Sequence, residues 1–201
     1  MTAVSLRPVS PADLATIDRW AAAIGADAPS RTRPYAASAE RHDPAAGLFW
    51  TVVVTDGRDV GTIWIERLGL SDARLGVFLG DPADFGRGLG RSALRLAIAQ
   101  YREAYPGDPV SLHVRRSNAR AVACYRAVGF VIVDTGSKVL PSGERVAFET
   151  MVLAGSPSAA DRLASTSGRQ ARRDDGLRQG CDALQLKCNS VRTTLWKDRP
   201  P

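Results

Sequence analysis

A glycine-rich segment, FGRGLGRSAL from Phe85 to Leu94, constrains the fold of this chain more than any other feature. It follows a short apolar run, Leu75 to Leu79, and leads into a helical pattern from about Gly88 to Ala104, so it lies where a strand passes into a helix. Glycine adopts backbone conformations that other residues avoid, and the first turn of a helix leaves N–H groups unpaired. The segment therefore predicts a cradle of backbone N–H groups for a phosphate. The glycines that would form it are Gly86, Gly88 and Gly90.

A second segment, NARAVACYRAVGF from Asn118 to Phe130, begins about thirty residues further along. Its pattern predicts a helix from Asn118 to Val128, with Gly129 ending it in a left-handed turn. Ala121, Cys124 and Val128 would share the buried side. Asn118 is the expected N-cap, a role that contributes about 1 kcal/mol.

Together these segments resemble the GNAT superfamily of N-acetyltransferases. The family pattern is Arg/Gln-x-x-Gly-x-Gly/Ala in the first segment and Asn-x-x-Ala-x-x-x-Tyr-x-x-x-Gly-Phe in the second. The resemblance covers roughly residues 4 to 153 and implies an α/β (α+β) GNAT fold: a mixed, mostly antiparallel sheet of about six to seven strands flanked by helices. It is closest to the branch of ribosomal-protein N-terminal and aminoglycoside 6'-acetyltransferases.

The rest of the pattern fits that order of elements. Ser10-Pro11-Ala12-Asp13 predicts a helix start, with a stop at Gly25, and residues 26 to 47 read as a loop. Asp56-Gly57 predicts a hairpin turn between two strands. The predicted strands are Phe49–Thr55, Val60–Leu68 with alternating burial, Leu75–Leu79, Val110–Val114, Phe130–Asp134 and Arg145–Leu153, the last two joined by a turn at Pro141-Ser142-Gly143.

The resemblance implies acetyl-CoA as co-substrate, held by the glycine cradle and by the backbone of the preceding strand. Arg87 and Arg91 would add positive charge at the rim. The alternative is that the glycines only make a tight turn. Phe85 departs from the family, which has Arg or Gln there, and one phosphate contact would be weakened. The predicted cofactor-binding residues are Phe78, Leu79, Gly86, Arg87, Gly88, Leu89, Gly90, Arg91, Ser92 and Asn118.

Acetyl transfer from a thioester to an amine needs a neutral amine and a proton for the departing thiolate. By resemblance Tyr125 donates that proton; its alternative role is a packed aromatic. The base is less clear, because the strand before the cradle has no carboxylate at the family position. Glu66 is the nearest replacement, with Asp72 and His113 behind it, and a water chain is the other route. Cys124 is expected to pack in the core.

These observations predict an acetyl-CoA-dependent N-acetyltransferase that acts by direct transfer on a primary amine, either a peptide N-terminus or a small molecule. A noncatalytic acyl-CoA-binding module is the first alternative. An aminoglycoside 6'-N-acetyltransferase is the second, disfavoured by the balanced charges of residues 25 to 48. No metal is expected, and the expected oligomeric state is a monomer or a homodimer.

The net charge of +6 is concentrated at the end of the chain: residues 155–201 hold nine Lys/Arg and five Asp/Glu. The chain is expected to divide into an acetyltransferase domain, residues 1–154, and a disordered basic tail, residues 155–201. Specific nucleic-acid binding is not expected. Three cysteines, Cys124, Cys181 and Cys188, form no disulfide framework or metal motif. With no leader and no membrane-spanning run, a cytoplasmic protein is expected.

Overall fold

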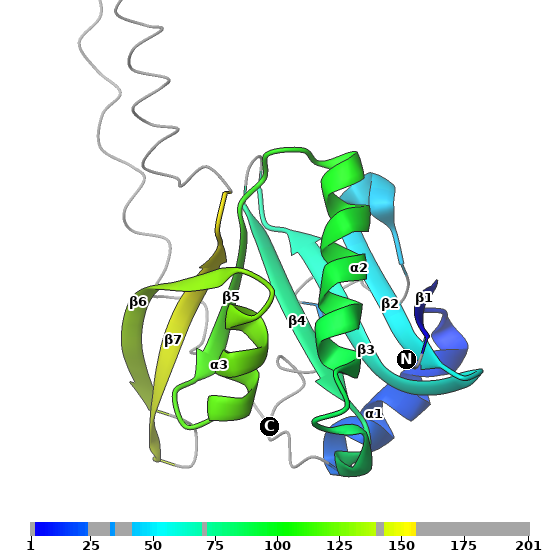
Figure 1. Ribbon diagram of the computed structural model, residues 1–201, viewed down its shortest axis with the longest axis horizontal. Coiled ribbons are helices and arrows are strands. Elements are labelled where there is room, and N and C mark those ends of the chain that lie inside the picture. The colour runs from blue at the N-terminus through cyan, green and yellow to red at the C-terminus, as the bar shows by residue number, and fades with distance from the viewer. Residues whose placement is uncertain (1–2, 24–32, 35–41, 70–71, 140–142, 156–201) are drawn as a thin grey trace, which may run out of the picture. The chain divides into compact units, whose positions relative to one another are not determined.

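A computed structural model describes residues 3–23, 33–34, 42–69, 72–139 and 143–155 (Figure 1). Seven strands and three α-helices make up this part of the chain. In chain order they are β1 (Val4–Pro8), α1 (Leu14–Ala23), β2 (Leu48–Thr55), β3 (Arg58–Arg67), β4 (Ala73–Leu79), α2 (Leu89–Ala104), β5 (Val110–Arg115), α3 (Ala119–Arg126), β6 (Phe130–Val139) and β7 (Arg145–Leu153). The predicted fold class is confirmed.

The strands form one sheet in the order β1-β2-β3-β4-β5-β7-β6. All neighbours are antiparallel except β4 and β5, which are parallel. The predicted hairpin turn is confirmed, because Asp56 and Gly57 have φ values of 49° and 72°, as a type I′ turn requires. Strand β1 is absent from the sequence prediction, since it is short and ends in a proline at the edge of the sheet.

The helices cover opposite faces of the sheet (Figure 1). On one face Ile17 of α1 packs with Trp50, Val52 and Trp64. On the other face α2 and α3 pack over the larger core, which contains the buried Tyr101 of α2. Strand β3 lies inside the sheet between β2 and β4 and is buried on both faces from Val60 to Glu66, so its predicted alternation is wrong.

The start of α1 follows the predicted pattern. Ser10 precedes a short 3₁₀ turn, Pro11–Asp13, that continues into α1. The Asp13 carboxylate accepts from the backbone N–H and the hydroxyl of Ser10, both at 2.8 Å. Arg7 also donates to Asp13, at 2.7 Å, and this contact is the main reason that the pKa of Asp13 lies far below its usual value.

Helix α3 differs in which side it buries. Its buried residues are Val122 and Tyr125, whereas the predicted set, Ala121, Cys124 and Val128, is only partly buried. Ala121 and Cys124 line a cleft beside α3, which leaves these two side chains partly open. The predicted stop at Gly25, most of the 26–47 loop, the Pro141-Ser142 part of the last turn, Cys181, Cys188 and the tail beyond Gly155 lie outside the described residues.

Candidate active site

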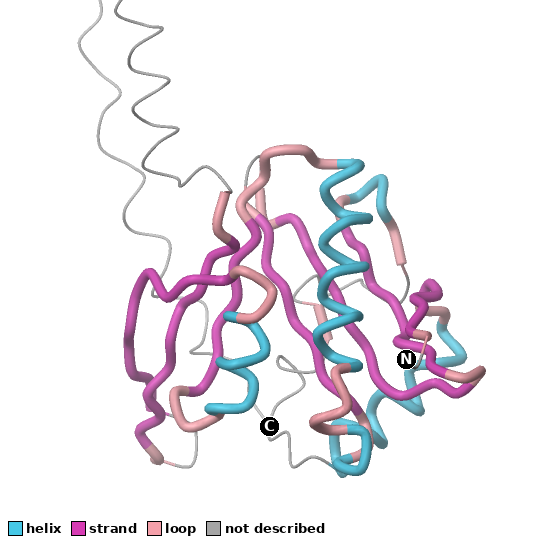
Figure 2. Tube along the Cα trace, viewed as in Figure 1, coloured by secondary structure: helices cyan, strands magenta, loops and turns pink. Residues whose placement is uncertain are grey.

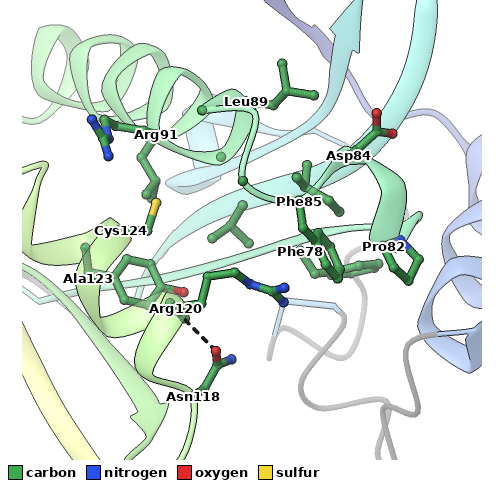
Figure 3. A pocket seen from close by; sticks show the side chains of 18 of the residues that line it. Phe78, Pro82, Asp84, Phe85, Leu89, Arg91, Asn118, Arg120, Ala123 and Cys124 are labelled. Atoms are coloured by element: carbon green, nitrogen blue, oxygen red, sulfur yellow. Dashed lines mark hydrogen bonds between the residues drawn. The ribbon is translucent and has the colours of Figure 1, made fainter.

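Figure 2 shows the backbone of β4, the loop that follows it, the start of α2 and α3. A cleft of about 670 Å³ opens between these segments (Figure 3). We call it the α2–α3 cleft. The two sequence segments therefore meet in space, because residues from both line it. The predicted site residues that line it are Phe78, Leu79, Gly86, Gly88, Leu89, Gly90, Arg91, Asn118 and Tyr125.

The cleft exists because β4 and β5 separate. They pair only at Ala73 with Val110 and at Arg74 with Ser111, at the start of both strands. Beyond that point β4 pairs with β3 alone, up to Leu79. The backbone of β4 at Phe78 and Leu79 therefore has one edge towards the cleft, where an extended chain can add as a strand would.

The loop between β4 and α2 depends on glycine for its conformation. Gly86 and Gly88 have φ values of 77° and 82°, in the left-handed region. A Cβ atom at either position would meet no atom within 4 Å, so conformation rather than crowding by the protein demands glycine. Gly90 is different: its φ is not positive, and a Cβ there would lie 3.9 Å from the Cys124 sulfur, an ordinary contact.

The first turn of α2 lines the cleft and carries N–H groups that are unpaired within the helix. Gly88 is the N-cap, and the N–H groups of the next three residues have no partner within the helix. The first turn contains no acidic side chain, so the partial positive charge of the helix end is not neutralised there. The structure places Ser92, another predicted contact, outside the cleft lining, and its N–H donates to the Gly88 carbonyl at 3.1 Å.

A buried carboxylate holds this loop in place. Asp84 is 2% exposed and forms ion pairs of 2.8 Å with Arg58 of β3 and with Arg87. The hydrogen bond from Arg58 is the main reason that the pKa of Asp84 is lowered. Arg87 was expected at the rim of the phosphate site, but it binds Asp84 and does not line the cleft. Through this ion pair Arg87 stabilises the loop between β4 and α2.

Tyr125 lies in the cleft wall with its ring edge-on to Phe130, at 5.9 Å between centroids. It is 8% exposed, and burial raises the pKa of its hydroxyl well above the usual value. The neighbouring thiol of Cys124 also lines the cleft, and burial raises its pKa too. At neutral pH both groups therefore keep their protons, which suits a proton donor and not a thiolate nucleophile.

Asn118 caps α3 as predicted. Its Oδ1 accepts from the N–H of Ala121 at 3.2 Å, and Figure 3 shows this bond at the edge of the cleft. The amide NH₂ group of Asn118 is not used by the cap. A cap and a ligand contact are therefore compatible at this residue.

The candidates for the base do not reach the cleft. Glu66 is 3% exposed. In the strand register its backbone lies opposite that of Arg74, at the far end of β4 from Leu79, and Glu66 does not line the cleft. The distance along β3 explains the miss, because Glu66 lies five residues from Gly61, which pairs with Leu79. The structure therefore places Glu66, the predicted base, apart from the residues that line the cleft.

His113 faces away from the core on β5, and its Nδ1 lies 3.3 Å from Nη1 of Arg74. Burial, followed by the Arg74 charge, lowers the pKa of His113. Because Arg74 donates to Nδ1, the only lone pair of a neutral imidazole is occupied in this arrangement. Asp72 is exposed at the start of β4 and does not line the cleft.

Several cleft residues were not identified from the sequence. Asp84 precedes the glycine segment without any motif of its own. Arg120, inside the second segment, places its guanidinium carbon 3.9 Å from the centroid of the Phe85 ring. The arginine in the N-x-R-A pattern was the available signal, because it follows a helix cap that faces the cradle.

Among the residues that the structure describes, no group of three or more His, Cys, Asp or Glu side chains is arranged to hold a metal ion. The same residues contain no helix of the length and apolar character needed to cross a membrane.

Similar folds occur in solved acetyltransferase structures. A chimera of the Vibrio cholerae spermidine N-acetyltransferase SpeG with hSSAT is 18% identical, with a TM-score of 0.60, over 75% of this chain and 94% of that one. The yncA protein of Salmonella typhimurium, solved with its cofactor acetyl-CoA, is 20% identical, with a TM-score of 0.59, over 78% and 99%. A GNAT-family acetyltransferase from Streptococcus pneumoniae is 16% identical, with a TM-score of 0.56, over 75% and 98%. These likenesses concern the fold.

A search of curated proteins finds no significant match. The family model described as acetyltransferase (GNAT) family matches residues 15–130, which is more than half of the chain and includes both segments of the cleft. The chain therefore belongs to the GNAT family and is an N-acetyltransferase.

Proposed function

We propose that this protein transfers the acetyl group of acetyl-CoA directly to a primary amine, with the donor bound in the α2–α3 cleft. One observation carries the proposal. The left-handed glycines Gly86 and Gly88, the open edge of β4 and the protonated Tyr125 all face one cavity. A phosphate group, an extended amide-bearing arm and a departing thiolate need these three features in this order.

The residues of the cleft fit acetyl-CoA. Backbone N–H groups at the start of α2 suit the pyrophosphate, since a helix N-terminus favours anions. The free edge of β4 at Phe78 and Leu79 suits the amides of the pantetheine arm. Arg91 adds positive charge at the first turn of α2.

Tyr125 is the proposed proton donor to the sulfur that leaves. Its raised pKa keeps the hydroxyl protonated well above neutral pH. The raised pKa of Cys124 disfavours a route through an acetylated cysteine. The raised pKa values of Tyr125 and Cys124 therefore both support direct transfer of the acetyl group from donor to acceptor.

We propose that the amine loses its proton to water. Among the residues that the structure describes, Asp84 is the one carboxylate that lines the cleft, and two arginines bind it. Its lowered pKa makes it a weak base. Glu66, the earlier candidate, lies outside the cleft lining.

The acceptor is proposed only as a class, a primary amine. A peptide N-terminus and a small-molecule amine both fit, and the likeness to a spermidine N-acetyltransferase adds a polyamine to the set worth testing. An aminoglycoside remains the alternative acceptor. The balanced charges that disfavour an aminoglycoside belong to residues 25 to 48, most of which lie outside the described residues.

Release of free thiol from acetyl-CoA tests the proposal across a panel of spermidine, amino-terminal peptides, small amines and an aminoglycoside. We expect turnover with at least one amine and a large loss of that turnover in Tyr125→Phe. Acetyl-CoA binding without turnover on any amine of the panel would contradict catalysis and favour the noncatalytic alternative.

We also propose residues 1–154 as the catalytic domain and residues 155–201 as dispensable for chemistry. A chain truncated after Ala154 should keep the kcat and the acetyl-CoA affinity of the full chain. Loss of either quantity in a folded truncated chain would assign the tail a part in the site.

A further inference from the structure

Phe85 and Arg120 form a contact between the two walls of the α2–α3 cleft. Phe85 ends the 3₁₀ turn before the glycines, and Arg120 is the second residue of α3. The guanidinium carbon lies 3.9 Å from the ring centroid, and both residues line the cleft. Figure 3 shows the Arg120 side chain extending from α3 towards Phe85. The contact is a cation–π stack between segments 35 positions apart in the sequence.

The stack leaves the hydrogen-bonding groups of Arg120 available. A guanidinium that lies over an aromatic ring uses its face and keeps its N–H groups in the plane free to donate. Among the described residues, Arg120 has no ion-pair partner, in contrast to Arg58 and Arg87, which share Asp84. Arg120 is therefore an oriented cation whose donors face no described carboxylate.

Position 85 is also where the chain departs from its family pattern, which has Arg or Gln at the start of the phosphate cradle. We propose that Arg120, held on the ring of Phe85, replaces that missing side chain and binds the pyrophosphate of acetyl-CoA. A guanidinium and a phosphate match in shape, because two parallel N–H groups meet two oxygens. Phe85 then positions Arg120 and makes no polar contact of its own. This inference rests on the proposed function, because it assigns a residue to the same donor site.

The Phe85 side chain explains why arginine is needed on α3. The flat guanidinium stacks on the ring, whereas a lysine ammonium would keep the charge and lose the planar fork. Arg120→Lys should therefore retain only part of the contribution that Arg120 makes to acetyl-CoA affinity. Phe85→Leu should weaken binding through Arg120, since leucine offers no ring to orient it.

The test measures the affinity of the full-length chain for three donors: acetyl-CoA, the analogue that lacks the 3'-phosphate, and S-acetyl-pantetheine, which has no phosphate. We expect Arg120→Ala to lower the affinity for acetyl-CoA and for the analogue without the 3'-phosphate by about tenfold or more, and by the same factor for both. The affinity for S-acetyl-pantetheine should stay within about twofold. Arg126→Ala is the matched control, since Arg126 is an exposed arginine of the same helix outside the cleft lining.

A rescue experiment separates this role from general damage. Phe85→Arg in the Arg120→Ala background puts a guanidinium back at the family position, and we expect it to recover most of the lost acetyl-CoA affinity. Thermal unfolding of each variant checks that the chain remains folded.

Different outcomes would contradict different parts of the proposal. Arg120→Ala that binds acetyl-CoA as well as the parent would overturn it, as would an equal loss for all three donors. A loss confined to acetyl-CoA would mean that Arg120 binds the 3'-phosphate, which overturns the assignment to the pyrophosphate. A parent chain that binds none of the three donors would instead refute the proposed function itself.

Discussion

The indole ring of Trp64 covers Gly76 on the neighbouring strand so closely that no Cβ atom would fit at Gly76. Trp64 is 3% exposed and belongs to the core beneath α1. Gly76 lies on β4 just before Phe78 and Leu79, where the strand begins to line the cleft. The packing of one face of the sheet therefore fixes the strand that forms a wall on the other.

The space around Gly76 and Gly90 predicts different results for alanine at the two positions. Gly76→Ala should lower the free energy of unfolding by about 1 to 3 kcal/mol, because the buried indole has to move. Gly90→Ala should cost little, since its Cβ would make only an ordinary contact with Cys124 inside a helix. Urea unfolding of both variants checks the pair, and equal stability of Gly76→Ala and the parent would contradict the packing described above.

Tyr125→Phe removes the proposed proton donor and keeps the ring that packs against Phe130. We expect kcat to fall by about 100-fold or more, with the affinity for acetyl-CoA unchanged. Tyr105→Phe serves as control, because Tyr105 lies outside the cleft lining and donates to the Pro44 carbonyl.

The pH profile adds a second check on Tyr125. Its raised pKa means that the hydroxyl still carries its proton at the ordinary tyrosine pKa of about 10. Tyr125 should therefore cause no loss of kcat as the pH rises from 7 to about 10. A descending limb with its midpoint at or below about pH 10 that disappears in Tyr125→Phe would show a normal or lowered pKa.

Asn118 allows its two roles to be separated. Asn118→Ala should lower the free energy of unfolding by about 1 kcal/mol through loss of the cap. Asn118→Asp keeps a capping oxygen, so stability should be retained while the new negative charge in the cleft weakens acetyl-CoA binding. If Asn118→Asp binds acetyl-CoA as the parent does, Asn118 is a structural cap only.

Asp84 should contribute stability that depends on pH. Its pKa is lowered in the folded state, so its contribution is present above the ordinary carboxyl value of about 4 and disappears as the pH falls through the lowered pKa. Asp84→Asn should cost about 1 to 3 kcal/mol at pH 7, a range that allows for the half-exposed arginine partners.

The difference in the free energy of unfolding between Asp84→Asn and the parent, measured with urea, should shrink steadily from pH 5 to pH 2. Asp56→Asn, an exposed hairpin residue, should show no such difference. A gap between Asp84→Asn and the parent that stays constant over this range would contradict the ion pairs as its source.

The sequence predicts most of the fold because its local signals agree with its tertiary contacts. Asp56-Gly57 can form few other turns, and the glycines before α2 favour a left-handed loop wherever they occur. Strand β1 gives no such signal, because five residues at a sheet edge owe their conformation to β2. Strand β3 looks like an alternating strand until helices on both faces are known to bury it.

The candidate site follows from the sequence only where backbone geometry decides the role. Gly86, Gly88 and Tyr125 meet in the cleft because the motif and the splayed strands place them there. Arg87, Glu66 and Arg120 depend on partners distant in sequence. Arg87 binds Asp84 and not the rim of the cleft, and Arg120 lies over the ring of Phe85. Neither contact can be predicted from the spacing of residues in the sequence.

The most direct test of the donor site is a calorimetric titration of acetyl-CoA into the parent chain, Gly88→Asp and the control Gly57→Asp. Gly88 and Gly57 share a left-handed conformation, with φ values of 82° and 72°, and neither has an atom within 4 Å of its added Cβ. The backbone strain of the two variants is thus alike, and only Gly88 lies in the cradle. We expect binding to the parent and to Gly57→Asp, with a loss of at least about 100-fold in Gly88→Asp. Equal binding to all three chains, or no binding to the folded parent, would contradict a cofactor cradle at the start of α2.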